Sequence, residues 1–475
     1  MVSLGNAEVL EVEYQNGKVT KLKVKSNTHT FTLCSDGNFG IDDEICPRNP
    51  DASITKLLNQ YQEGATVGLV QDKTNSNIYY YVGGNDVVTN NHLWYGGHHW
   101  RVMKIDTTNN TLLLVSQQPL TAIHPASTVW DTEEEYETSY INNWLNEYFY
   151  NSLDSSIQNN ILNNTFNVGI YTDVDEITTT RKVGLLDQAQ YTRAGGQNSY
   201  LNIKDYFWLG NRYSSSSVRR VDSGGVLSFI SPVNADGVRA VIKISDITVT
   251  EGDGTLTSNY KTAAKATNTN NVQVGEYINV PYSGSECGTD KKCTFRVVSK
   301  DDDSIKVVLN GLLPTTSQYG SNATITTSHT IYTPLNNFAN NISSDYRHTG
   351  NKTFYIGDYP RGANYKDVQD ETLQASVGLP TVGEMFSGND IDLGTSSTKT
   401  FVDVNTIENP TINNYYWTMN RYSSSSVHYV NGDGGLYSIN PSAVGVRAVI
   451  YLKSGTSGLT FTGGNGTAQS PYTLQ

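Results

Sequence analysis

Residues 211–218 read NRYSSSSV, and residues 420–427 read NRYSSSSV again. Downstream, residues 237–242 read GVRAVI, and residues 445–450 repeat these six letters. The spacing from the first motif to the second agrees within one residue between the two places, which excludes chance as an explanation. The chain therefore contains an internal duplication, the sequence signature of tandem structural units.

The duplication continues outward from these motifs. The stretch TEGDGT at 250–255 parallels TGGNGT at 462–467, and WRV at 100–102 parallels FRV at 295–297. Each copy is therefore about 200 residues long, in keeping with the ordinary size of a domain.

From these matches we expect three parts along the chain. The first segment, 1–62, belongs to neither copy, and the two modules occupy 63–260 and 261–475. In the first segment, residues 9–32 alternate between apolar and polar side chains around the turn signal Asn16-Gly17, which predicts a small β segment.

Inside each module the pattern changes from strands to a helix and back to strands. In the first copy an apolar stripe at helical spacing follows three strand-like runs, and it consists of Ile141, Trp144, Leu145, Tyr148 and Phe149. Short strands and Gly-rich turns then lead to a closing strand at 238–244. Strands and helices that segregate in this way predict an α+β fold.

The end of each copy resembles a known bacterial pattern. Residues 206–212 read YFWLGNR, residues 221–225 read VDSGG, and GVRAVI follows at 237–242. This series resembles the ending of C-type-lectin-like domains in Gram-positive (Firmicutes) extracellular surface proteins, in which a proline stands where this chain has Ala240 and Ala448. The resemblance implies two tandem C-type-lectin-like modules, with mixed antiparallel sheets and short helices, on a secreted or cell-surface protein.

Composition favours the same compartment and excludes some partners. Only 17% of the 475 residues are charged, and the net charge is −13. An acidic surface repels phosphate backbones, so we expect no nucleic-acid partner. No apolar run approaches the roughly 18 residues of a membrane span, so none is expected. Residues 1–5 lack the features of a signal peptide; we expect that a native leader was removed, and a cytosolic protein is the alternative.

The four cysteines form two local pairs, Cys34 with Cys46 and Cys287 with Cys293. Short loops closed by disulfides are typical of oxidising compartments, so we expect both pairs to be disulfides. Four free thiols, or a zinc site built from the two pairs, are the alternatives, although neither pair has the usual spacing of zinc ligands.

Candidate ligand contacts come from comparing the copies. Shared positions, such as Trp208/Trp417 and Arg239/Arg447, are expected to serve packing or structural hydrogen bonds. Positions that differ are free to serve binding, and aromatic and arginine side chains suit such contacts. The residues predicted to bind ligand are Arg219, Arg220, Asp222, Phe229, Met419, His428, Tyr429, Asn431 and Tyr437. In this comparison Arg220 corresponds to Tyr429, and Phe229 corresponds to Tyr437. Unselected drift on a solvated face is the alternative.

The serine runs at 214–217 and 423–426 have two interpretations. They could form a binding loop with adaptable hydroxyl groups. Their identity in both copies favours a turn that the backbone defines.

Metal and cofactor sites find less support. Asp301–Asp303 and Glu133–Glu135 offer oxygen ligands for calcium, and His92, His98 and His99 could hold zinc, but acidic runs are usually solvated turns or helix starts. No catalytic motif with a known mechanism is present. We therefore predict no metal, no cofactor and no enzymatic activity.

Two functions remain in competition, with an enzyme that resembles the formylglycine-generating enzymes of sulfatase maturation as a third alternative. The first is a cell-surface or secreted adhesin whose modules bind an extracellular glycan or protein ligand. The second is a structural subunit of an extracellular fibre or pilus, whose contacts are with copies of itself.

Overall fold

The computed structural model describes most of the chain. The described residues are 8–15, 18–25, 30–33, 39–41, 53–126, 128–153, 155–170, 177–234, 236–245, 247–249, 251–256, 258–262, 266–287, 289–321, 323–357, 371–385, 415–430, 436–468 and 470–475. The described fold is mostly β with a few short helices, so the α+β prediction holds in this coarser form.

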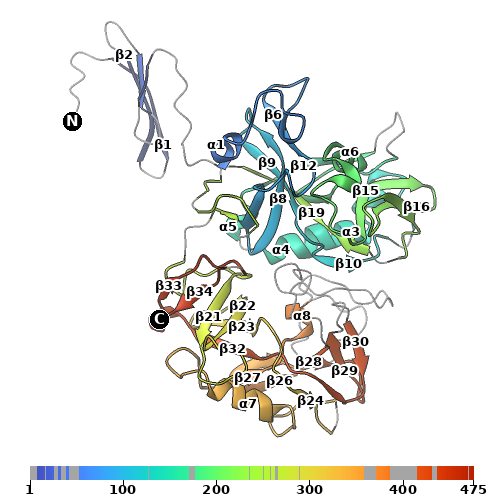
Figure 1. The fold of residues 1–475 in the computed structure, drawn as a ribbon, viewed down its shortest axis with the longest axis vertical. Helices are drawn as coiled ribbons and strands as arrows, with labels where there is room; N and C mark the ends of the chain where they lie inside the picture. The colour runs from blue at the N-terminus through green and yellow to red at the C-terminus, as the bar shows by residue number, and fades with distance from the viewer. Residues whose placement is uncertain are drawn as a thin grey trace.

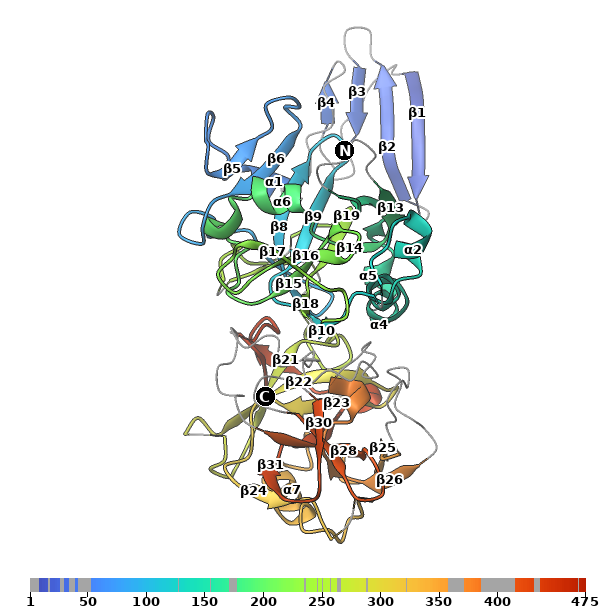
Figure 2. The ribbon, with the colours of Figure 1, turned by 90° about the vertical axis from the view of Figure 1, so that its right-hand side faces the viewer.

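The first segment forms a small antiparallel sheet, as its alternating pattern predicts (Figure 2). Its strands, in the spatial order β1-β2-β3-β4, are β1 (Glu8–Gln15), β2 (Lys18–Lys25), β3 (Thr30–Leu33) and β4 (Phe39–Ile41). The predicted turn at Asn16 and Gly17 and the predicted disulfide between Cys34 and Cys46 lie outside the described residues.

The first unit is built on two sheets (Figure 1). The larger sheet contains β5 (Gly68–Gln71), β6 (Ile78–Val82), β7 (His92–Tyr95), β8 (His98–Asp106), β9 (Thr111–Ser116), β11 (Ile161–Leu162), β14 (Val183–Leu185), β19 (Ala240–Ser245) and β20 (Tyr260–Lys261). The five-stranded sheet has the spatial order β10 (Thr121–Ile123), β18 (Asp236–Val238), β15 (Phe207–Ser214), β16 (Ser217–Val221) and β17 (Leu227–Ile230). A separate hairpin joins β12 (Asn164–Asn167) to β13 (Thr178–Arg181).

A continuous helical segment crosses the first unit where the apolar stripe predicts it. It consists of α3 (Tyr140–Asn143), η1 (Trp144–Phe149) and α4 (Tyr150–Ser152), preceded by α2 (Glu133–Glu137) and followed by α5 (Ser155–Gln158). Ile141, Trp144 and Leu145 are buried, as the stripe requires.

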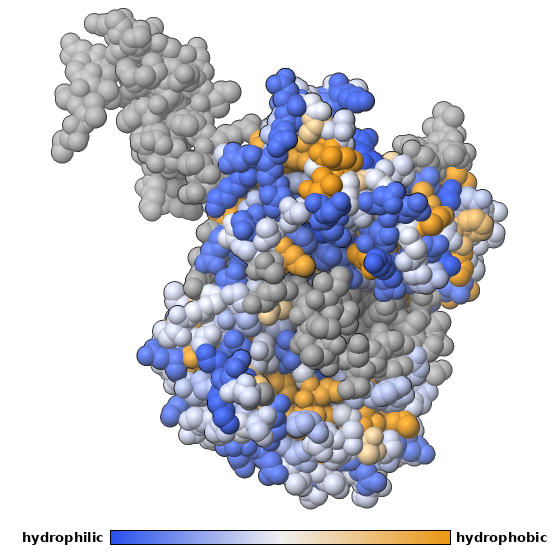
Figure 3. Space-filling model, viewed as in Figure 1, coloured by the Kyte–Doolittle hydropathy of each residue, from blue (hydrophilic) through white to orange (hydrophobic). Residues whose placement is uncertain are grey.

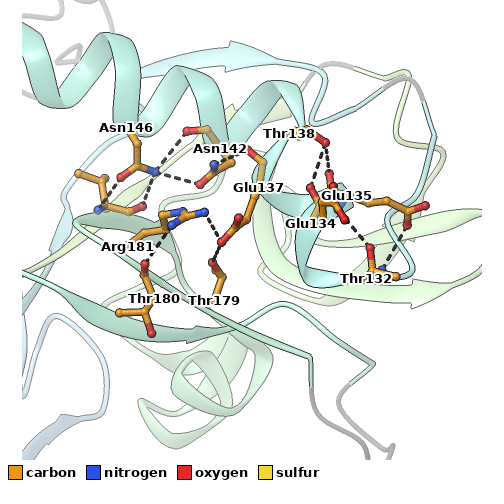
Figure 4. Close-up of polar contacts among 11 residues, drawn as sticks. Thr132, Glu134, Glu135, Glu137, Thr138, Asn142, Asn146, Thr179, Thr180 and Arg181 are labelled. Atoms are coloured by element: carbon orange, nitrogen blue, oxygen red, sulfur yellow. Dashed lines mark hydrogen bonds and ion pairs between the residues drawn. The ribbon is translucent and has the colours of Figure 1, made fainter.

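Polar contacts fix this helix against the sheets (Figure 4). The Asn146 side chain accepts the backbone N–H of Val183 at 3.1 Å and donates to its carbonyl oxygen at 3.0 Å. Glu137 accepts a hydrogen bond from Thr179 Oγ1 and forms an ion pair with Arg181. The helical segment is therefore tied to β14 through Asn146, and the preceding helix α2 is tied to β13 through Glu137. The partners lie about 40 positions along the chain.

The second unit repeats the arrangement of the first. Its larger sheet has the spatial order β27 (Val377–Gly378), β32 (Val449–Lys453), β23 (Ser304–Leu309), β22 (Lys292–Lys300), β21 (Tyr277–Pro281), β34 (Tyr472–Leu474) and β33 (Phe461–Gly463). Its five-stranded sheet has the order β24 (Thr316–Gln318), β31 (Ala443–Gly445), β28 (Tyr416–Arg421), β29 (Val427–Val430) and β30 (Leu436–Ile439). The strands β25 (Lys352–Tyr355) and β26 (Thr372–Ala375) form the hairpin, and the helices are α7 (Tyr332–Asn340) and α8 (Val382–Met385).

The endings of the units are built alike. Gly252 and Gly464 have φ values of +84° and +80°, and an added Cβ would lie 1.9 Å from a backbone oxygen in each case. Only glycine fits such a position. These turns lead into Tyr260 and Tyr472, which pair in parallel with β7 and β21 respectively. The parallel between 250–255 and 462–467 in the sequence is therefore a repeated structural closure.

The predicted boundaries need two adjustments. A helix that the sequence did not predict, α1 (Ser53–Leu58), buries Ile54 and Leu57 in the core of the first unit, so this unit begins before residue 63. The second adjustment concerns the boundary between the units. The backbone of Lys261 pairs with Trp94, so this residue belongs to the sheet of the first unit, although its Nζ donates to Glu276 Oε1 of the second unit at 2.8 Å.

The two units contact each other around this lysine (Figures 1 and 2). Arg296 Nη2 of the second unit donates to the carbonyl oxygen of Gly97 at 3.2 Å. The rings of Trp94 and Tyr277 lie with their centroids 6.3 Å apart. A Cβ on Gly97 would lie 2.1 Å from the carbonyl oxygen of Val274, so the two backbones touch directly.

Three buried histidines lie behind this junction. His92 Nδ1 and His99 Nε2 are 2.8 Å apart, and the ring of His98 packs edge-on against Phe149 with centroids 5.3 Å apart. Burial lowers the pKa of His98 to about 3, with a further contribution from Arg296. Burial, and then Arg101 and His99, also lower the pKa of His92.

His92 and His98 should make the protein less stable in acid. The unfolded chain binds their protons near pH 6.5 whereas the folded chain does not, so stability is complete above that pH and is lost as the pH falls below it. We expect H98Q to reduce the loss of unfolding free energy between pH 7 and pH 5 by about 2 kcal/mol. Urea titrations at both values, with H348Q as the control, measure this; equal losses in the parent protein and H98Q would contradict the prediction.

Candidate ligand-binding faces

The five-stranded sheets carry the predicted ligand contacts, and matching buried groups hold both sheets. Trp208 Nε1 donates to the carbonyl oxygen of Ile123 in β10 at 2.8 Å, and Trp417 Nε1 donates to that of Ser317 in β24 at 3.0 Å. Both side chains are fully buried. The shared tryptophans are therefore structural, as the comparison of the copies predicts.

Asn211 and Asn420 form a second matching pair. The Asn211 side chain accepts the backbone N–H of Gln188 at 2.6 Å, and that of Asn420 accepts the N–H of Val382 at 2.7 Å. Each asparagine thereby ties its sheet to the first turn of a short helix, α6 (Gln188–Arg193) in the first unit and α8 in the second.

Arg239 and Arg447 complete this internal frame. Arg239 donates from Nε to the carbonyl oxygen of Ser116 at 2.9 Å and from Nη1 to that of Leu201 at 2.7 Å. Arg447 Nε donates to the carbonyl oxygen of Leu309 at 2.9 Å. Both side chains are fully buried, and burial lowers the pKa of Arg239 to about 9.

The strand register is also the same in both units, and it corrects one expected equivalence. Trp208 lies opposite Arg220, and Trp417 lies opposite Tyr429. Across the next strand pair, Arg220 faces Ser228 and Tyr429 faces Tyr437. Tyr437 is therefore the counterpart of Ser228 and not of Phe229. The copies differ in length by one residue after these strands, between residues 230 and 237 in the first copy and between 439 and 445 in the second, and a comparison made back from the closing motif therefore shifts the match by one.

In the first unit, two arginines stack on exposed tyrosines. The guanidinium of Arg220 lies 4.7 Å from the ring centroid of Tyr206 and forms an ion pair with Asp236 at 3.1 Å. The guanidinium of Arg219 lies 4.3 Å from the ring centroid of Tyr213.

Phe229 completes this exposed surface. Its ring stacks on that of Tyr213 with centroids 3.9 Å apart, and the Phe229 side chain is 49% exposed. Figure 3 shows hydrophobic surface at this end of the first unit. Asp222 stabilises the turn that follows β16, because its carboxylate accepts the backbone N–H groups of Gly224 and Val226.

In the second unit, three tyrosines form a row. The ring centroids of Tyr415 and Tyr429 are 5.9 Å apart, and those of Tyr429 and Tyr437 are also 5.9 Å apart. Tyr415 is 52% exposed, and the other two are half-buried. A groove of about 430 Å³ begins at Tyr415 and is lined by residues 312–316 and 443–445. Aromatic side chains beside a groove suit a ligand with apolar faces and polar edges.

The remaining predicted contacts lie elsewhere. Met419 is fully buried, and its sulfur accepts the backbone N–H of Leu379, so its prediction as a surface contact is wrong. His428 is only 4% exposed and packs edge-on against Tyr422, so it supports the face from within. Asn431 lies outside the described residues.

Sequence comparison missed some of the most exposed residues of these faces. Tyr206 and Tyr415 occupy equivalent positions, as do Tyr213 and Tyr422, and each pair is identical in both copies. Because the candidate contacts were chosen among positions that differ between the copies, these identical tyrosines were left out. Their place beside the Trp motif and the serine run was the signal that could have found them.

The serine runs form turns. Ser214 Oγ accepts the backbone N–H of Ser216 at 3.2 Å, and Ser423 Oγ accepts that of Ser425 at 3.3 Å. The turn in the second unit has the same hydrogen bond as the turn in the first. This agrees with the expectation that the serine runs are identical because both form the same backbone turn.

The groups considered for metal binding have other contacts. Glu135 caps α2 by accepting the backbone N–H of Thr132, and Cys287 and Cys293 form a disulfide (Figure 4 shows the cap). Within the described ranges, no three His, Cys, Asp or Glu side chains gather as a metal site would require.

The frame predicts how one substitution acts. R239M removes both donors from buried carbonyl oxygens, so we expect a loss of about 2 kcal/mol in unfolding free energy. R219M removes an arginine from the surface of the same unit, and its effect should stay within about 1 kcal/mol. Urea titrations measure both, and equal stability of the two variants would show that the buried arginine does not support the frame.

Comparisons with known proteins give no closer assignment. No family model, no curated protein and no solved structure matches this chain. Within the part that the structure describes, no helix has the length and apolarity to cross a membrane.

Proposed function

We propose that the chain is an extracellular, surface-associated binding protein whose two units are C-type-lectin-like modules, and that the second unit binds a neutral glycan. The observation that carries this proposal is the row of Tyr415, Tyr429 and Tyr437 beside the groove. The rings offer stacking surface for sugar rings, and their hydroxyl groups offer hydrogen bonds to sugar hydroxyls.

The difference between the units supports binding rather than spacing. Where the second unit has Tyr429 and Tyr437, the first has Arg220 and Ser228 in the same register. A repeated spacer has no need for different surface chemistry on an identical buried frame. Two faces with different side chains suit two different ligands, and joining them in one chain increases avidity when both are engaged.

Charge favours a neutral ligand for the second face. Its row consists of tyrosines, and the strand residues beside it include the exposed Ser438 and Asn440. At the matching register position the first unit carries Arg220, which is paired with Asp236, and the adjacent Arg219 lies on the opposite face of the strand. The first face is therefore suited to a different, more polar partner.

The substitution Y437S tests this proposal because it places the residue of the first unit at the equivalent position of the second. We expect Y437S and Y429A each to weaken glycan binding about tenfold or more, since aromatic anchors commonly contribute above 1.4 kcal/mol. Glycan-array screening of the parent protein, followed by calorimetric titration of the variants, measures this. The control is Y213A, which changes an exposed tyrosine of the first unit.

Three results would contradict the proposal. These are the absence of any glycan bound by the parent protein, equal binding by Y429A and the parent, and ordered filaments as the main species at high concentration. The last result would support the fibre subunit instead.

A further inference from the structure

A pocket in the first unit lies apart from the five-stranded sheets. Its volume is about 250 Å³, and it lies between the larger sheet and helix α6. The lining includes Tyr80, Lys104, Leu113, Gln190 and Tyr200. This volume is slightly below the range of drug-sized sites, so it suits a small ligand.

The floor of the pocket belongs to a cross-strand row. Tyr80 lies opposite Lys104, Lys104 lies opposite Leu113, and Leu113 lies opposite Lys243. Residues directly opposite one another on neighbouring strands have side chains on the same face of the sheet. Two lysines therefore flank one leucine on the face that α6 covers.

In the second unit, the equivalent region of the larger sheet contains a lysine whose charge is neutralised by an internal acid. The counterpart of Leu113 is Lys306, because each lies opposite the matching position of the closing strand, Lys243 or Tyr451. The counterpart of Gln190 is Glu384, because each makes the same reciprocal hydrogen bonds with the N-cap residue of its helix. Lys306 and Glu384 form a buried ion pair.

The first unit has the cation without this acid. Gln190 is neutral, and within the described residues Lys104 takes part in no ion pair. Arg193 is paired with Asp72 at 3.3 Å and stacks on Tyr80 at 4.3 Å, so it forms a wall of the pocket. Burial is the main cause that lowers the pKa of Lys104; Asp106 acts in the opposite direction, and Lys243 and Arg193 lower this pKa further.

One further polar group lines the pocket. Tyr200 is 1% exposed, and its hydroxyl has no hydrogen-bond partner among the described residues. A buried hydroxyl without a partner costs free energy that a ligand or a water molecule can recover. The rest of the lining combines apolar groups, such as Met103 and Leu201, with polar Asn164 and Thr165. It also includes Asp187, the N-cap residue of α6, whose carboxylate accepts the backbone N–H of Gln190 at 2.7 Å.

We propose that this pocket binds a small carboxylate ligand, whose carboxyl group takes the place beside Lys104 that Glu384 takes beside Lys306. A carboxylate is favoured because the second unit neutralises the equivalent region with one carboxyl group. The ligand body then packs between the Tyr80 ring and α6. This site is independent of the glycan face proposed for the second unit.

The substitution Q190E tests the proposal by giving the first unit its own internal acid. The probes are glucuronate and benzoate, with glucose and benzyl alcohol as their neutral counterparts, titrated into the full chain by ligand-detected NMR and calorimetry. We expect both carboxylates, or one of them, to bind the parent protein more tightly than the neutral counterpart. Q190E and K104M should each weaken that binding at least tenfold, while Q190E keeps or raises the Tm.

A matched control makes the result specific. Q374E makes the same change of charge at an exposed position of the second unit, and carboxylate binding should be unchanged. The proposal is overturned if neither carboxylate binds at millimolar concentration, if the neutral compounds bind equally well, or if Q190E binds as the parent does. These outcomes do not depend on whether the second unit binds a glycan, so the two proposals can fail separately.

Discussion

Each unit encloses an arginine that is out of reach of water, and the arrangement of the unit depends on what that arginine binds. Arg239 and Arg447 lie at the start of the closing strands and donate to backbone carbonyl oxygens of neighbouring segments. A buried guanidinium group that lost these acceptors would cost free energy, so the carbonyl groups are held in place. The five-stranded sheet is thereby fixed relative to the larger sheet in both units.

With the frame fixed from within, the outer side chains are free to differ. The tryptophans and asparagines repeat the same hydrogen bonds in both units, whereas arginine and serine in one unit are replaced by two tyrosines in the other. The same contrast appears at the pocket, where an internal ion pair in the second unit is replaced by a leucine and a glutamine in the first. In both places the two copies share backbone positions and differ in the chemistry they present.

Much of this arrangement was accessible from the sequence because duplication is visible without any structure. The repeated motifs located both units, and the apolar stripe located the helix that contains Trp144. The predictions that failed were those that depend on strand register or on residues distant in the sequence. Met419 was placed on the surface although its strand position turns it inward. Phe229 was matched to Tyr437 because the copies differ in length by one residue in the loop that follows these strands. The helix α1 was missed because six residues without a counterpart in the second copy give little periodicity.

The pocket was beyond sequence reasoning for a similar reason. Lys104 and Leu113 become neighbours through strand pairing, and the relation of Gln190 to Glu384 emerges only when the two helix starts are compared in space. Tyr206 and Tyr415 were missed for the opposite reason, because identical residues were assigned to the frame. Identity between copies marks structure when the side chain is buried, but exposed identical residues can serve binding as well.

The central claim is that the buried Trp, Asn and Arg residues determine the fold of each unit, while the outer side chains of the five-stranded sheet determine what it binds. Exchanging these outer side chains between the units tests the claim most directly. A variant of the second unit carrying Y429R and Y437S has the side chains of the first unit at the matching register positions of the exposed row. Its unfolding free energy and its glycan binding should be measured on the same preparation. The account predicts cooperative unfolding within about 1 to 2 kcal/mol of the parent, together with loss of the ligand of the second unit. Loss of cooperative unfolding, or full retention of glycan binding, would contradict it.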